Sequence, residues 1–262
     1  MGHEFTGKVV QISPSVRTVS IGDEIVCPFT TSCGKCYYCL GGHTSRCSSS
    51  LLFGSPALDG AQAQFVRVPL ADGTVVKAPA GIPPTTLILM ADIFPTGFFA
   101  ARNAFAGLAA AEVHDCTAVV IGCGPVGLCA VVAAAMEWKP RLLIAVDCVS
   151  ERLERARSLG AEPWDFKTDR EGLMRRVKEA TGGRGADVVM EVVGNSSALR
   201  LAFDLLRPWG MLSSVGVHNG EMPWSGSEAY AKNLRLQMGR CPVRGIFKEA
   251  LEVLVRRQEV FG

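Results

Sequence analysis

The chain has 262 residues, 48% of them hydrophobic, and its 27 Lys and Arg residues nearly balance its 25 Asp and Glu residues. These values describe a folded protein of one or two domains. A formal charge of +2 without a block of basic residues argues against nucleic acid or anionic lipid as the main partner, because both require a concentrated basic face. We therefore expect a small-molecule partner.

The sequence also carries no membrane or export signal. The longest apolar segment, 117–136, is interrupted by three glycines and a proline, so it lacks the continuous span that a membrane helix requires. The amino terminus, Met1-Gly-His-Glu-Phe, has neither the basic nor the apolar region of a secretory signal. We expect a protein of the reducing cytoplasm, without a membrane partner.

Short β-like runs occupy the first third of the chain. Residues 7–12, 23–27 and 63–69 are rich in β-branched side chains and are separated by Gly, Pro, Ser and Asp. This pattern predicts a small β-rich domain over residues 1–90.

Four of the ten cysteines cluster within this domain. Their spacing, C-x2-C-x2-C-x7-C, lets a short loop present four thiolates tetrahedrally to one ion. The four residues are Cys33, Cys36, Cys39 and Cys47. The spacing predicts a structural zinc site that leaves no open position for a substrate.

A zinc knuckle that binds nucleic acid is the alternative interpretation of this loop. The basic and aromatic residues that such a knuckle would use are Lys35, Tyr37, Tyr38 and Arg46. Structural zinc is favoured, because zinc ribbons usually pair two C-x-x-C knuckles across a longer spacer and the local charge here is slight. His43 is expected to be a solvated loop residue, since four thiols already complete the tetrahedron.

From about residue 91 the pattern changes to apolar strands that alternate with helices. Strands are predicted at 118–121, 142–146, 162–166, 188–191, 211–215 and 234–238. Helices are predicted at 125–137, 150–159, 171–181, 197–206 and 227–233. This alternation predicts a doubly wound parallel sheet over residues 91–240, followed by a return segment, 241–262, that leads back to the first domain.

A glycine-rich turn follows the first predicted strand of this sheet. Gly122-Cys-Gly-Pro-Val-Gly127 matches G-x-G-x-x-G between a strand and a helix, which is the context that gives the motif meaning. Gly122 permits the tight turn, Gly124 lets a pyrophosphate approach the backbone, and Gly127 lets helix and strand pack closely. The phosphates would meet the amino terminus of the helix, where Pro125 and Val126 complete the predicted site.

Asp147 ends the second strand, 20 residues after Gly127, where a carboxylate can accept hydrogen bonds from the adenosine ribose. This acidic residue favours NAD over NADP, because it would repel a 2′-phosphate. Arg152, a little over one helical turn later, could partly compensate for that charge. A glycine turn and a surface Asp in another α/β fold are the alternative to a cofactor site.

These motifs, with several further segments, resemble the zinc-dependent medium-chain alcohol dehydrogenase family. The further matching segments are Gly2-His-Glu-Phe-Thr-Gly7, Gly22-Asp-Glu-Ile-Val, Asp92-Ile-Phe-Pro-Thr-Gly97, residues 187–194 and Val215-Gly-Val. The resemblance covers nearly the whole chain. It implies a partial GroES-like domain with a four-cysteine zinc lobe, followed by a Rossmann domain that binds NAD.

The same resemblance implies the residues of a catalytic metal site. His3 would bind a catalytic zinc ion, and Glu4 would be an adjoining ligand or support it. Asp92 occupies the third ligand position, where many relatives carry Cys. An acidic residue followed by Pro-Thr-Gly is similar to the formaldehyde dehydrogenase branch, and a carboxylate is a competent zinc ligand.

The remaining implied residues contact the cofactor. Thr96 would line the nicotinamide pocket, Val193 and Val215 would flank the cofactor, and Arg152 would lie near its adenosine end. Ordinary core packing for the two valines and a solvated helix face for Arg152 are the alternatives.

The resemblance implies an NAD-dependent zinc oxidoreductase that transfers a hydride between a small alcohol or aldehyde and NAD. Members of the family also pair across the last strand of this sheet, near 234–238, which suggests a homo-oligomer. The family's first catalytic zinc ligand is a cysteine upstream of the G-H-E motif, and its closing strands follow the return segment. The chain is therefore expected to be truncated at both ends, and Cys27 is disfavoured as a substitute ligand.

The alternative is a truncated, catalytically weak protein that binds NAD and one structural zinc ion.

Overall fold

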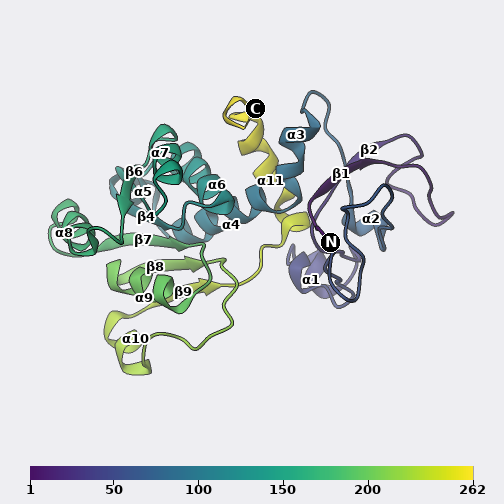
Figure 1. The fold of residues 1–262 in the computed structure, drawn as a ribbon. Helices are drawn as coiled ribbons and strands as arrows, with labels where there is room; N and C mark the ends of the chain where they lie inside the picture. Colours follow the sequence, from purple (N-terminus) through teal and green to yellow (C-terminus); the bar gives the residue numbers. More distant parts are fainter. Residues whose placement is uncertain (262) are drawn as a thin grey trace. The chain divides into compact units, whose positions relative to one another are not determined.

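The computed structural model describes residues 1–261, which form two compact units. The first unit comprises Met1–Pro95 and the residues from Cys241 onward, and the second comprises Thr96–Arg240. The second unit contains the larger sheet, drawn in teal and green in Figure 1.

The first unit is built on a three-stranded antiparallel sheet in the order β1-β2-β3. The strands are β1 (Phe5–Lys8), β2 (Glu24–Cys27) and β3 (Val76–Lys77). Because alternate side chains of a strand point to the same face, β2 contributes Ile25 and Cys27, and β1 contributes Phe5, to a small core. The buried members of this core are Phe5, Val19, Ile25, Cys27, Phe53, Leu58 and Val75.

The helices of the first unit are short, apart from the one that follows the second unit in the chain. They are α1 (Tyr37–Leu40), α2 (Ala71–Thr74), α3 (Pro84–Leu87) and α11 (Val243–Val255), with 3-10 turns η1 (Thr44–Arg46), η2 (Ile88–Ala91) and η4 (Gln258–Val260). The amide of Gly245 in α11 donates to the Thr44 hydroxyl at 3.2 Å. A Cβ on Gly245 would lie 2.0 Å from the Gly42 carbonyl oxygen, so the missing side chain lets α11 approach the cysteine loop.

The structure corrects two of the three β-runs predicted for this unit. The run at 23–27 is confirmed as β2, but the run at 7–12 contributes only the last two residues of β1. Residues 63–69 form no strand. An alternating pattern becomes a strand only beside a hydrogen-bonding neighbour, and the sheet formed by β1, β2 and β3 does not include 63–69.

The second unit contains a six-stranded parallel sheet in the order β6-β5-β4-β7-β8-β9. The strands are β4 (Thr117–Ile121), β5 (Leu142–Asp147), β6 (Glu162–Asp165), β7 (Ala186–Glu191), β8 (Leu206–Ser214) and β9 (Arg235–Met238). The strand order runs outward from β4 in both directions, so the topological switch point lies beside β4. The predicted doubly wound sheet is confirmed, and the largest boundary error is at β8, which begins at Leu206 instead of 211.

Five helices connect the strands of this sheet: α6 (Pro125–Ala133), α7 (Ser150–Ser158), α8 (Arg170–Ala180), α9 (Ser196–Leu205) and α10 (Gly226–Lys232). Two further helices, α4 (Ile93–Phe105), which begins in the first unit, and α5 (Ala110–Asp115), precede β4 in the chain. A π-helical turn, η3 (Ala134–Trp138), continues α6 and ends at Lys139 in the left-handed region. Every side chain of β4 is buried, as expected for a central parallel strand covered on both faces.

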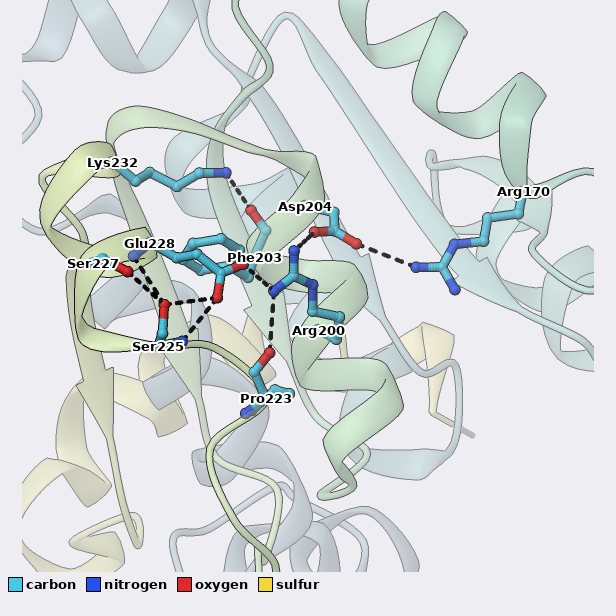
Figure 2. A network of polar contacts seen from close by, with 9 residues as sticks. All are labelled: Arg170, Arg200, Phe203, Asp204, Pro223, Ser225, Ser227, Glu228 and Lys232. Carbon is cyan, nitrogen blue, oxygen red and sulfur yellow. Dashed lines mark hydrogen bonds and ion pairs between the residues drawn. The ribbon is translucent and has the colours of Figure 1, made fainter.

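Polar side chains fasten α10 to α9 (Figure 2). The ammonium group of Lys232 donates to the backbone carbonyl of Phe203 and lies 4.3 Å from the centre of its ring. Arg200 donates to Glu228 at 2.7 Å and pairs with Asp204 of its own helix at 2.9 Å. The lysine thereby satisfies a carbonyl that the end of α9 leaves without a helical partner.

Within residues 1–261, no single helix is long and apolar enough to span a membrane. One pair of neighbouring helical segments, Pro84–Ala91 and Ile93–Phe105, reaches that length and composition only jointly, with a bend of 53° between them.

Candidate functional site

The four clustered cysteines converge on one point. Among residues 1–261 they are the one group of three or more possible metal ligands whose donor atoms all lie within 4.8 Å of one another. The sulfur atoms of Cys33 and Cys39 are 4.0 Å apart. Four zinc–sulfur bonds of about 2.3 Å at tetrahedral angles give sulfur separations of roughly 3.8 Å. The predicted cysteine cluster is confirmed, and its geometry fits a four-coordinate zinc ion.

Backbone amides around the cluster favour the thiolate form of some of its members. Hydrogen bonds from the amides of Cys39 and Ser48 lower the pKa of Cys36 to about 6. The amides of Cys33 and Ser49 donate to the sulfur of Cys47 at 3.3 and 3.4 Å. Burial raises the pKa of Cys39 to about 12, so burial opposes the ionised form of this thiol and a bound cation would favour it.

His3 is held in place by its backbone neighbours and by an aromatic ring. The amide of Ala61 donates to the Gly2 carbonyl at 3.0 Å, and the amide of Gln62 donates to the Met1 carbonyl at 2.9 Å. The imidazole ring lies 5.8 Å from the ring centre of Phe29. The side chain of His3 is 42% exposed, so the imidazole ring is partly open to solvent.

Asp92 lies beside His3, although 89 residues separate the two in the sequence. Asp92 follows η2, whose last residue, Ala91, accepts a hydrogen bond from the Phe29 amide at 3.0 Å. Nε2 of His3 is 3.2 Å from Oδ2 of Asp92. This hydrogen bond raises the pKa of His3. The structure therefore brings together the two residues that the resemblance assigns to a catalytic metal.

Glu4 and Cys27 are placed differently. Burial, and then the charge of Asp92, raise the pKa of Glu4, whose carboxylate accepts a hydrogen bond from the Ile93 amide. Glu4 therefore lies close to Asp92 without forming a compact donor set with His3 and Asp92. Cys27 is fully buried in the core of the first unit, and burial raises the pKa of its thiol.

The glycine-rich turn of the second unit follows β4 and leads into α6. Gly122 has φ of +95°, a conformation that favours glycine. A Cβ on Gly127 would lie 1.8 Å from the Gly122 carbonyl oxygen, so only glycine lets the helix pack this closely on the turn. A Cβ on Gly124 would meet nothing within 4 Å, so this part of the turn faces open space that a ligand can enter. Pro125 and Val126 form the first turn of α6.

Asp147 ends β5 with a buried carboxylate. Its Oδ2 accepts from the amide of Cys123 at 2.7 Å, and its Oδ1 accepts from the amides of Cys148 and Val149 at 2.7 and 3.0 Å. Arg152 is 3.8 Å from Oδ2. Each carboxylate oxygen can accept two hydrogen bonds, so Oδ2 retains capacity for a ribose hydroxyl.

The other predicted cofactor residues lie on separate elements. Thr96 is half-buried in the first turns of α4. Val193 follows β7 and is 47% exposed, whereas Val215 follows β8 and is half-buried. Both valines therefore lie at the carboxyl ends of neighbouring parallel strands, where ligands of open α/β sheets bind.

Sequence reasoning missed a buried polar network at the same edge of the sheet. Glu191, at the end of β7, has no exposed surface and contacts both Ser214 and His218. A charged residue that ends the apolar run Val188-Val-Met was the available signal, because a buried carboxylate requires donors nearby.

Comparison with known proteins follows the same division of the chain. The alcohol dehydrogenase GroES-like domain model matches residues 1–80, and the zinc-binding dehydrogenase model matches residues 125–256. The chain is 62% identical over 262 residues to zinc-type alcohol dehydrogenase B of Aspergillus flavus, covering 100% of this chain and 61% of that protein. It is 55% identical over 230 residues to a medium chain reductase/dehydrogenase of Acremonium sp, covering 88% of this chain and 78% of that protein.

Solved structures show the same likeness. The alcohol dehydrogenase from Thermus sp. ATN1 is similar with a TM-score of 0.88 and 32% identity, over 98% of this chain and 73% of that chain. The chain therefore spans about three fifths to four fifths of the length of these three relatives.

Proposed function

The chain belongs to the zinc-dependent medium-chain alcohol dehydrogenase family, and from this premise we propose that it transfers a hydride between a small alcohol or aldehyde and NAD. The observation that carries the proposal is the contact between His3 and Asp92. Their 3.2 Å separation is close to the distance between two ligands bonded at about 2.1 Å to one tetrahedral zinc ion.

In this proposal each unit has its own task. When bound, zinc would act as a Lewis acid that lowers the pKa of an alcohol, and NAD would accept the hydride. His3 would contribute Nε2 to the metal, and Asp92 would contribute a carboxylate oxygen. The hydrogen bond from Ile93 would hold the Glu4 carboxylate beside this pair. The four cysteines would bind a second zinc ion that stabilises their loop and has no open position.

The dinucleotide site of the second unit supports NAD as the cofactor. Gly124 leaves room for a pyrophosphate at the amino terminus of α6, and Oδ2 of Asp147 can accept from the adenosine ribose. The formaldehyde dehydrogenase branch stays a prediction that rests on Asp92. Pairing of two copies along β9, which forms one edge of the sheet, is also proposed, and light scattering after size-exclusion chromatography tests it.

A catalytically weak protein is the second candidate function. It is favoured by one observation: within residues 1–261, only the four cysteines gather three or more possible ligand atoms within 4.8 Å. Such a protein would bind NAD and a single structural zinc ion.

Metal content and cofactor binding together test the proposal. Two tightly held zinc ions per chain, NADH binding and alcohol-dependent NAD reduction are expected. Asp92→Ala should lose one zinc ion and the activity while retaining NADH binding, whereas Asp59→Ala, at an exposed loop position, should behave as the wild type. One zinc ion per wild-type chain, unchanged in Asp92→Ala, would support the second candidate instead.

A further inference from the structure

The sheet topology assigns different halves of a dinucleotide to different strands. The order reverses at β4, and a doubly wound sheet binds one nucleotide half on each side of such a switch point. β5, with Asp147 at its end, lies on the adenosine side. The carboxyl ends of β7 and β8 therefore face the nicotinamide half in the proposed function, on which this inference rests.

Glu191 occupies this position with every acceptor site of its carboxylate filled. Oε1 accepts from the amides of Val193 and Gly194 at 2.8 and 2.7 Å. Oε2 accepts from the Ser214 hydroxyl at 2.7 Å and from Nε2 of His218 at 2.8 Å. Movement of this fully buried carboxylate would break at least one of its four hydrogen bonds and leave a buried polar group without a partner, which costs free energy. The four donors therefore hold the carboxylate in one position.

Two turns meet at this carboxylate with their backbones in direct contact. A Cβ on Gly216 would lie 2.2 Å from the Gly194 nitrogen, and a Cβ on Gly194 would lie 2.6 Å from the Val217 nitrogen. Glu191 binds the amides of the first turn, 192–194, and His218 binds Glu191 from the second turn, 215–218. The turns leave the side chains of Val193 and Val217 47% and 77% exposed, as an apolar surface.

The network is unsuited to nucleophilic catalysis. In a Ser-His-acid triad the two partners contact different imidazole nitrogens, whereas here Ser214 and Glu191 both contact Nε2 of His218, at 3.1 and 2.8 Å. Ser214 is also fully buried and donates its proton to Glu191. Since a carboxylate only accepts, Nε2 of His218 carries a proton and acts as a fixed donor.

We propose that Glu191 and His218 are positioning residues, which hold the turns 192–194 and 215–218 as one platform for the nicotinamide half of the cofactor. They act through the backbone and the exposed valines, and touch neither substrate nor cofactor themselves.

The test measures, in the full chain, how much each half of the cofactor contributes to binding. His218→Leu removes the donor, and His218→Gln restores an amide N–H near the position of Nε2. His114, exposed on α5, gives the matched control His114→Leu. Dissociation constants for NADH and for ADP, which lacks the nicotinamide half, are measured by calorimetry. His218→Leu should weaken NADH binding about tenfold, as expected for a lost charge-assisted hydrogen bond, and leave ADP binding within about twofold of wild type.

Each outcome decides between the possibilities. A selective loss for NADH that His218→Gln reverses supports the inference, together with faster amide exchange at Val193 and Gly194 in His218→Leu. Equal loss for NADH and ADP indicates a merely structural role and overturns it, as does unchanged NADH binding. The inference is also overturned if the folded wild-type chain binds NADH no more tightly than it binds ADP. A folded wild type that binds neither ligand overturns the proposed function and this inference with it.

Discussion

At the scale of single residues, Asp147 joins the fold to the proposed cofactor site. Its carboxylate accepts from three backbone amides, and one of these, Cys123, lies within the glycine-rich turn. The acid therefore fixes the turn from β5, in addition to any contact with a ribose.

Asp147→Asn should damage both roles. Asparagine keeps one acceptor oxygen, so at least one of the three amides would face an NH2 group instead of an oxygen. We expect the free energy of unfolding to fall by about 1–3 kcal/mol, the cost of an unsatisfied buried group, and NADH binding to weaken. Urea unfolding and fluorescence titration measure the two effects. Asp59→Asn, at an exposed position, is the control, and equal stability of the two variants would contradict the structural role of Asp147.

At the scale of elements, two glycines of the turn between β4 and α6 should have different roles: Gly124 should matter for cofactor binding alone, and Gly127 for stability as well. Gly124→Ala places a methyl group in open space at φ of −68°, so we expect an unchanged unfolding midpoint and weaker NADH binding. Gly127→Ala forces a Cβ to within 1.8 Å of the Gly122 oxygen, so we expect loss of both stability and binding. Differential scanning fluorimetry and NADH titration of both variants check this. If the Gly124→Ala variant binds NADH as tightly as the wild type, the pyrophosphate does not bind at this turn.

Elements with a strong periodic pattern could be predicted from the sequence, and elements decided by tertiary contact could not. β4 and β5 were predicted to within one residue at each end, because a buried parallel strand is a continuous apolar run. Nothing in the sequence pattern predicted α4, since Pro95 and Gly97 are usually helix breakers. Proline is tolerated in a first helical turn. A Cβ on Gly97 would lie 2.6 Å from the Ala130 amide, so packing against α6 explains that glycine.

The candidate site divides in the same way. The spacing of the four cysteines predicts their cluster, because they lie in one short loop. The pairing of His3 with Asp92 came from family resemblance alone, because 89 residues separate them. The network of Glu191, Ser214 and His218 depends on the register between β7 and β8 and on the turn after β8, which a single sequence does not specify.

The link between α9 and α10 should make stability depend on pH through Glu228. The Ser225 amide, and then Arg200, lower the pKa of Glu228 to about 2, well below the ordinary value of about 4.3. A carboxylate with a lowered pKa stabilises the fold above its unfolded value and loses that contribution as pH falls toward its folded value. The melting-temperature difference between wild type and Glu228→Gln should therefore be constant above about pH 5 and shrink toward pH 2.

Glu179→Gln, at an exposed position on α8, is the control for this titration. If the melting-temperature difference between wild type and Glu228→Gln is the same at pH 3 and pH 7, the charge of Glu228 does not contribute to stability.

At the scale of the whole molecule, the two units depend on different interactions. The second unit has a continuous core under a six-stranded sheet. The cysteine loop of the first unit has only α1 and η1, of 4 and 3 residues, which are too short to be stable alone. Its order therefore depends on the metal and on its neighbours. These are α11, whose Gly245 contacts Gly42 and Thr44, and α2, whose Gly73 packs against Cys33.

Removal of zinc should therefore loosen one unit and spare the other. After chelation under reducing conditions, amides of the cysteine loop and of the first turn of α11 should exchange at least about tenfold faster, because four unbound thiol groups no longer hold the loop closed. Amides of β4 and β7 should keep their protection. Cys36→Ser should reproduce this pattern without a chelator, and Cys148→Ser, a half-buried cysteine outside the loop, should not. If chelation instead accelerated amide exchange equally in both units, the stability of the second unit would depend on the cysteine loop. The two units would then unfold as one cooperative unit, which would contradict this prediction.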